Sequence, residues 1–248
     1  MQFEPVLPMK TLGANAKIKR VKTGVAGLDE MIGGGIPEGH SMLVLGSFGT
    51  GKTTMGLQFM WEGLQEKEKC LFITLEESVD SLVKDAYSFG WDLKPYIEKR
   101  QLALFDLQAN HLRDAIRLVK NDMYNIMKEF KANRVVIDSI SLVEMLNSEE
   151  YERRITLRNI CELLKSTGAT SLITCETKNS GSMMSRFGYI EYVVDGIILL
   201  EPRPELDAKR TLLTIRVLKL KRSGHTRDIK LYIISDKGIK VQTDVRVR

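Results

Sequence analysis

The 248-residue sequence is poor in the residue types that build metal centres and disulfide frameworks. It has three cysteines and three histidines, all far apart, and no Cys-x-x-Cys pair. Cys70, Cys161 and Cys175 each lie in an apolar run, which favours buried thiols in a reducing compartment over disulfides or a zinc site. Because the histidines are equally dispersed, we expect neither a disulfide scaffold nor a metal cluster.

Long hydrophobic runs and low-complexity segments are also missing. No stretch approaches the roughly 20 apolar residues of a membrane span, and the N-terminus lacks the apolar core of a signal peptide. Hydrophobic residues make up 43% and charged residues 28% of the chain, which is ordinary globular composition. We therefore expect a cytoplasmic protein without a membrane partner, with a polar lead over residues 1–20 and a single domain over residues 21–248.

Short apolar runs typical of buried strands alternate with segments of helical periodicity. The predicted strands are residues 41–45, 71–75, 102–105, 134–138, 171–175 and 197–200, and the predicted helices are residues 53–65, 78–90, 111–130 and 149–166. This alternation predicts an α/β fold with a mostly parallel sheet and helices on both faces. Beyond residue 200 the helices stop, and residues 211–218, 229–234 and 238–242 predict a C-terminal antiparallel extension.

A glycine-rich loop joins the first predicted strand to the first predicted helix. Residues 46–53, GSFGTGKT, fit the phosphate-binding pattern G-x-x-x-x-G-K-[ST]. A loop that curls its N–H groups around a phosphate needs residues without a Cβ, and the following helix adds its positive end. We expect Lys52 to contact the β- and γ-phosphates of ATP, and the Thr53 hydroxyl to bind Mg²⁺. The expected nucleotide-binding residues are Ser47, Phe48, Gly49, Thr50, Gly51, Lys52, Thr53 and Thr54.

Three carboxylates follow predicted strands. Asp138 ends the run 134–138, and an acid at the tip of a parallel strand points into the crevice where ligands bind. It is expected to hold Mg²⁺ with Thr53, although a lone acid there could instead cap a helix. Glu76 and Glu77 follow the strand 71–75, which can lie beside the strand that carries the loop. Spacing alone leaves two roles open for these glutamates. They can be the acids that commonly open a helix, or one of them can be the general base that deprotonates the attacking water.

The C-terminal fifth of the chain is its basic part. Residues 201–248 contain thirteen Lys and Arg against six Asp and Glu, a net charge of +7, whereas the rest sums to −2. Such a charge suits a solvated hairpin surface, contact with nucleic acid, or cations delivered to a phosphate. Charge alone does not decide among these three.

Several motifs in a fixed order give the chain a family resemblance. Residues 22–29 (KTGVAGLD) and 33–39 (GGGIPEG) resemble the opening segment of KaiC-like proteins in the RecA superfamily of P-loop ATPases. The resemblance spans about residues 18–242 and implies a RecA-like fold. The motifs that follow in the family's order are the phosphate-binding loop, Glu76-Glu77, residues 89–91, Asp138-Ser139, Asp195-Gly196, residues 219–221 and His225.

The resemblance also implies roles for individual residues. Glu76 and Glu77 match a pair of catalytic glutamates, of which Glu77 is the expected base. Lys219 and Lys221 match basic residues that members of the family present to the γ-phosphate of a neighbouring subunit, and His225 matches a residue near the same nucleotide. Arg222 follows Lys221 and is a further candidate for this role. Basic residues that one subunit presents to the nucleotide of its neighbour imply a homo-oligomeric ring, which is expected to be a hexamer.

One departure from the family pattern concerns phosphorylation. Where the phosphorylated half of the two-domain clock protein in this family carries adjacent Ser and Thr, this chain has Glu191 and Tyr192, so autokinase activity is not expected. The expected function is Mg²⁺-dependent ATP hydrolysis that drives a regulatory or signalling change through an unknown protein partner. Two alternatives stay open: a DNA-dependent recombination or repair ATPase similar to RadA paralogues, and an ATP-dependent regulatory scaffold with little turnover. No DNA-binding accessory module is visible, but a nucleic-acid partner is not excluded.

Overall fold

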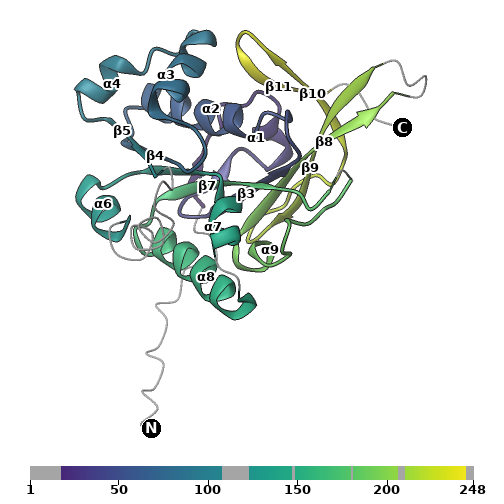
Figure 1. Ribbon diagram of the computed structural model, residues 1–248. Coiled ribbons are helices and arrows are strands. Elements are labelled where there is room, and N and C mark those ends of the chain that lie inside the picture. The colour runs from purple at the N-terminus through teal and green to yellow at the C-terminus, as the bar shows by residue number, and fades with distance from the viewer. Residues whose placement is uncertain (1–17, 108–122, 147–148, 180, 206–209, 244–248) are drawn as a thin grey trace.

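A nine-stranded sheet forms the centre of the structure. The computed structural model describes residues 18–107, 123–146, 149–179, 181–205 and 210–243. In these ranges the strand order is β11-β10-β9-β8-β3-β7-β6-β4-β5 (Figure 1). The parallel strands are β3 (Ser41–Gly46), β4 (Cys70–Thr74), β5 (Leu102–Asp106), β6 (Arg134–Asp138), β7 (Thr170–Glu176) and β8 (Gly196–Pro204). The antiparallel strands are β9 (Thr211–Leu220), β10 (Lys230–Ser235) and β11 (Gly238–Gln242). The predicted α/β class with a C-terminal antiparallel extension is confirmed.

The strand order corrects one expectation. The strand that follows the loop helix, β4, was expected beside β3, but β7 and β6 lie between them. Both neighbours of β3, β7 and β8, come from much later in the chain and pair with it in parallel. Such long crossovers are possible because helices carry the chain back over the faces of the sheet.

Helices cover both faces of the sheet, and each face has its own core cluster. The first cluster takes side chains from α1, α2 and α3, with α4 packed at its edge; the second takes them from α6, α7, α8 and α9 (Figure 1). The helices of the first face are α1 (Leu28–Met31), α2 (Lys52–Gln65), α3 (Val79–Ser88) and α4 (Lys94–Glu98). Those of the second are α6 (Met123–Phe130), α7 (Ile140–Leu146), α8 (Glu150–Ser166) and α9 (Ile190–Val193).

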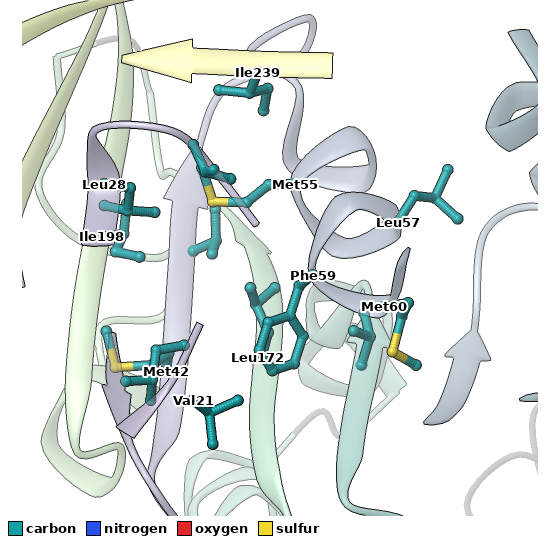
Figure 2. Close-up of a cluster of buried hydrophobic side chains, with 14 of the residues drawn as sticks. Val21, Leu28, Met42, Met55, Leu57, Phe59, Met60, Leu172, Ile198 and Ile239 are labelled. Atoms are coloured by element: carbon teal, nitrogen blue, oxygen red, sulfur yellow. The ribbon is translucent and has the colours of Figure 1, made fainter. Parts of the chain in front are cut away.

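The two-sided burial explains why the strands read as continuous apolar runs. Along β3, Met42 and Val44 belong to the first cluster, whereas Leu43 and Leu45 belong to the second. Figure 2 shows Met42 among the side chains of the first cluster, together with Phe59 of α2. Because successive strand residues point to opposite faces, every position of such a strand must be apolar.

The predicted helices agree with the structure wherever it describes them. Ser78 caps α3, since its Oγ accepts the N–H of Ser81 at 3.2 Å. Of the helix predicted over residues 111–130, only α6 lies in the described part of the chain, and residues 111–122 lie outside it. Most of the lead predicted over residues 1–20 lies outside it as well. Among the described helices, none has both the length and the apolar composition that crossing a bilayer demands.

A buried arginine fastens the opening segment to the amino end of the sheet. Arg134, the first residue of β6, is only 1% exposed. Its guanidinium donates to the carbonyls of Lys22 at 2.7 Å and Phe59 at 2.9 Å and to the carboxylate of Glu68. These bonds satisfy a charge that would otherwise be costly to bury, and they join three separate stretches of chain.

Candidate functional site

The candidate site lies at the carboxyl-terminal ends of the parallel strands, which form one side of the sheet, called the carboxyl edge from here on. Gly46 at the end of β3 pairs with Glu176 of β7, and Thr74 of β4 pairs with Asp138 of β6. The loop after β3 therefore shares one edge with the acids that follow β4, β6 and β7. Ligands bind at this edge in open parallel sheets.

The phosphate-binding loop has the backbone that its glycines allow. Gly49 and Gly51 have φ angles of 72° and 82°, which L side chains rarely adopt. Gly46 is required for a different reason, because a Cβ there would lie 2.5 Å from Thr50 Oγ1. The loop leads directly into α2, which begins at Lys52 with Gly51 as its N-cap and has no acid in its first turn. No acid of α2 itself therefore competes with a phosphate for the positive end of this helix.

Lys52 and Thr50 both donate to one carbonyl of the loop. Lys52 Nζ lies 2.9 Å from the carbonyl oxygen of Ser47, and Thr50 Oγ1 lies 2.7 Å from the same atom. Phe48, which follows Ser47 in the chain, is 89% exposed. Thr53 and Thr54 are half-buried in the first turn of α2. The lysine is therefore held over the loop, within reach of an anion bound there.

Asp138 is held in place from two sides. The side chain is buried, and one of its oxygens accepts a hydrogen bond from the hydroxyl of Thr174 on β7. Its carbonyl accepts the N–H of Leu75 at 2.7 Å, which joins the ends of β6 and β4. A carboxylate oriented by a neighbouring hydroxyl, together with the Thr53 hydroxyl, offers the hard oxygen ligands that Mg²⁺ prefers.

The two adjacent glutamates have different surroundings. Loss of hydration raises the pKa of Glu76, against a lowering hydrogen bond from Ser139, and the charges of Asp138 and Lys52 also act on it. Desolvation also raises the pKa of Glu77, but that carboxylate accepts the hydroxyl of Ser81 in α3 at 3.2 Å. The charge of Asp138 acts on both carboxylates, but the charge of Lys52 acts on Glu76, whereas Glu77 is hydrogen-bonded to Ser81 of α3.

Three residues of this edge were missed by the sequence reasoning. Glu176 ends β7 beside Gly46, Thr174 bonds Asp138, and Tyr232 of β10 donates its hydroxyl to Thr50. The signal for Glu176 was present, since it is an acid that ends an apolar run, as Asp138 is. Glu176 also lines a cleft of about 570 Å³ beside the loop. Further residues of this cleft are Ser47, Phe48, Thr50, Lys178, Pro202 and Leu213.

Lys221 lies at the opposite end of the parallel strands from the phosphate-binding loop, and Lys219 lies two residues before it on β9, level with the middle of β3. Lys219 of β9 pairs with Ile197, which pairs with Leu43, three residues before the end of β3. Lys221 donates its N–H to Asp195, whose own N–H is bonded to Ser41 at the start of β3. Five steps of about 3.3 Å therefore place Lys221 about 17 Å along the sheet from Gly46. Neither lysine is brought to the phosphate-binding loop of its own chain.

The surroundings of these lysines are largely backbone and carboxylate. Lys219 Nζ donates to the carbonyl of Glu191 at 2.8 Å, and burial, followed by the charge of Lys221, lowers the pKa of Lys219. Asp195 pairs with Lys165 at 3.1 Å and Lys221 at 3.5 Å. Burial opposes ionisation of Asp195, but the N–H of Ser41 and the ammonium of Lys165 keep its pKa low.

His225 lies near the same end of the parallel strands as Lys221. Its neighbour Thr226 donates its N–H to the carbonyl of Met31, at the end of α1. Its Nε2 is buried and has no hydrogen-bond partner among the described residues. His225 therefore lies in the same segment as Lys221, four residues further along the chain.

Comparison with known proteins agrees with this arrangement. The family model described as "ATPase: KaiC" matches residues 21–246. The circadian clock oscillator protein KaiC of Synechococcus elongatus is 33% identical over 233 residues, which cover 90% of this chain and 44% of that protein. Its counterpart in Prochlorococcus marinus is 34% identical over 234 residues, with 91% and 45% covered. The chain thus spans less than half the length of these curated relatives.

A solved structure extends the likeness to three dimensions. The crystal structure of a KaiC-like protein from Pyrococcus horikoshii OT3 superposes with a TM-score of 0.80 at 32% identity, covering 91% of this chain and all of that one. The chain belongs to the KaiC family of ATPases, and its RecA-like fold and general ATP-binding function follow from that membership.

Proposed function

We propose that this protein hydrolyses ATP in a Mg²⁺-dependent reaction at the interface between copies of the chain. The supporting observation is the separation of the two halves of the site across the sheet. The loop and Asp138 lie where the parallel strands end, whereas Lys221 lies where they begin and Lys219 lies level with the middle of β3. A cation that cannot reach its own nucleotide can serve that of a neighbour, and repetition of such a head-to-tail contact closes a ring. We expect a hexamer.

In this proposal the phosphates bind in the loop and at the N-terminus of α2. Lys52 exchanges its bond to Ser47 for the β- and γ-phosphates. Thr53 and Asp138 hold Mg²⁺, and Thr174 orients the aspartate. When bound, the ion neutralises the charge of the phosphate oxygens.

We assign the general base to Glu76 rather than to the Glu77 expected from the sequence. Glu76 lies among the charges around the loop, whereas Glu77 is held by Ser81. A raised pKa makes a carboxylate a better proton acceptor near neutral pH. The Glu76 carboxylate takes a proton of the attacking water as the water oxygen bonds to the γ-phosphorus. The bond from the γ-phosphorus to the oxygen that bridges it to the β-phosphorus breaks, and ADP leaves with that oxygen and its electron pair.

The cation in trans stabilises the charge that develops on the γ-phosphate. Lys219 is half-buried, with a lowered pKa that reflects incomplete hydration, so little further desolvation is needed when it meets an anion. Lys221 and Arg222 are exposed next to it and are further candidates for the same role. His225 lies at the same end of the strands as Lys221 and would face the same nucleotide.

The proposal also covers what ATP hydrolysis is used for. We propose that the ring couples hydrolysis to a regulatory or signalling conformational change in the cytoplasm, read by a protein partner. Autokinase activity is not part of the proposal, because Glu191 and Tyr192 stand where the resemblance places adjacent Ser and Thr, and the Glu191 carboxylate accepts the N–H of Ser185.

The test is the mass of the purified protein with and without Mg-ATP, measured alongside phosphate release. A ring with slow hydrolysis that Lys52→Ala and Lys219→Ala each abolish would support the shared site. Lys240→Ala, which removes an exposed lysine from β11 of the same extension, is the matched control and should leave turnover unchanged. A monomer that hydrolyses ATP regardless of Lys219 would overturn the proposal. DNA-stimulated turnover would favour the recombination alternative, and a ring without turnover the scaffold.

A further inference from the structure

A tyrosine of the C-terminal extension contacts the phosphate-binding loop directly. Tyr232 of β10 is 2% exposed, and its hydroxyl donates to the carbonyl oxygen of Thr50 at 2.6 Å. The two residues are 182 positions apart in the chain. Burial raises the pKa of Tyr232, so the hydroxyl keeps its proton and remains a donor throughout the neutral range.

This bond fixes the direction of one peptide group in the loop. In a trans peptide the C=O and the following N–H point in opposite directions. Because the carbonyl of Thr50 points to the Tyr232 hydroxyl, the N–H of Gly51 points away from that hydroxyl. The carbonyl of Ser47 is engaged in a similar way by Thr50 Oγ1 and Lys52. Phosphate-binding loops bind their anion with backbone N–H groups, and a peptide group that is already fixed in its bound direction need not be turned on binding.

The β10–β11 hairpin is itself fastened to the loop and to α2. A Cβ on Gly51 would lie 2.7 Å from Ile234 Cδ1, so β10 packs closely against the loop. Gln58 of α2 accepts the N–H of Ile239 at 2.7 Å and donates to its carbonyl at 3.1 Å. These bonds hold Tyr232 at a fixed position relative to the helix that begins at the loop.

We propose that Tyr232 is a positioning residue for phosphate binding, and that its hydroxyl aligns the Thr50–Gly51 peptide with the phosphates of ATP. The C-terminal β10–β11 hairpin then contributes a residue to nucleotide binding, in addition to extending the sheet. This inference rests on the proposed ATP-binding function and adds a specific determinant to it. It concerns one hydroxyl, which allows a conservative test.

The test compares Tyr232→Phe with Tyr96→Phe. Tyr96 also has a bonded hydroxyl, which accepts from Gln65 at 2.9 Å near the far end of α2, so the chemical change is matched. We expect Tyr232→Phe to weaken binding of Mg-ATP and of Mg-pyrophosphate about fivefold to tenfold, the range of one hydrogen bond. The KM for ATP should rise by the same factor with kcat nearly unchanged, because the bond helps ground state and transition state alike. Tyr96→Phe should change none of these values.

A second variant separates the hydroxyl from the packing of the hairpin. Ile234→Ala loosens the contact with Gly51 but keeps the Tyr232 hydroxyl, so pyrophosphate affinity should stay within about twofold of wild type. Wild-type affinity in Tyr232→Phe, or an equal loss in Ile234→Ala, would overturn the inference. If the wild-type protein binds neither Mg-ATP nor pyrophosphate, the proposed function fails instead.

Discussion

Replacing Glu144 by Gln is expected to stabilise the protein at alkaline pH and to leave its stability nearly unchanged at acidic pH. Glu144 of α7 has an exposed fraction of 0%. One of its carboxylate oxygens accepts the thiol of Cys175 at 3.6 Å, and the other has no partner among the described residues. Burial first, and then the charge of Glu191, raise its pKa from 4.5 to about 7, against the lowering effect of Arg153.

The sign and size of the effect follow from this pKa. In the unfolded chain Glu144 ionises near pH 4.5, whereas in the folded protein it keeps its proton to about pH 7. The folded state thus binds the extra proton between these values, and stability falls as pH rises through this window. At about 1.4 kcal/mol per pKa unit, the full loss is on the order of 3 kcal/mol above pH 7. Glutamine does not ionise and avoids this loss.

The assay is urea unfolding of wild type and Glu144→Gln at pH 5, 6, 7 and 8. The difference in free energy of unfolding should grow with pH and level off above pH 7. Glu162→Gln on the exposed face of α8 is the matched control, expected to change stability by less than about 1 kcal/mol at every pH. A constant difference between Glu144→Gln and wild type across this range would refute the reasoning.

Three further predictions concern the site and its support. Thr174→Val should weaken Mg²⁺-dependent turnover about tenfold by releasing Asp138, and unchanged Mg²⁺ dependence would contradict the assigned role. Gly51→Ala should abolish binding of a fluorescent nucleotide, because φ of 82° is strained for alanine and its Cβ would clash with the hairpin; retained affinity would count against the loop geometry. Arg134→Met should lower the free energy of unfolding by about 3 kcal/mol, measured in urea, since it leaves Glu68 and two carbonyls without their donor. A loss below about 1 kcal/mol would mean that the arginine contributes little.

The regular elements could be predicted because their cause is local. A strand buried on both faces must be apolar at every position, so the runs around Met42 and Val136 were visible in the sequence. The phosphate-binding loop was equally visible, because only glycine allows its φ angles and only a strand and a helix can flank it. These features need no knowledge of distant parts of the chain.

What could not be predicted depends on distant pairings. The place of β4, separated from β3 by two other strands, follows from crossovers that the sequence does not encode locally. The different surroundings of Glu76 and Glu77 follow from the charge of Lys52 near the first and the hydrogen bond of Ser81 to the second, so spacing could not separate the two. Tyr232 is found only when β10 is placed against the loop. Burial of Arg134 at the start of an apolar strand likewise depends on three separate partners.

The central claim is that each active site takes its phosphate-binding loop from one copy and its cation from the next. The direct test mixes two inactive variants, Lys52→Ala and Lys219→Ala, and measures phosphate release. In randomly mixed rings roughly a quarter of the interfaces combine an intact loop with an intact Lys219, so activity should reappear at about that fraction of wild type. If the mixture stays as inactive as its components while mixed rings form, or if Lys219→Ala alone is active, the two halves do not act in trans and the account is wrong.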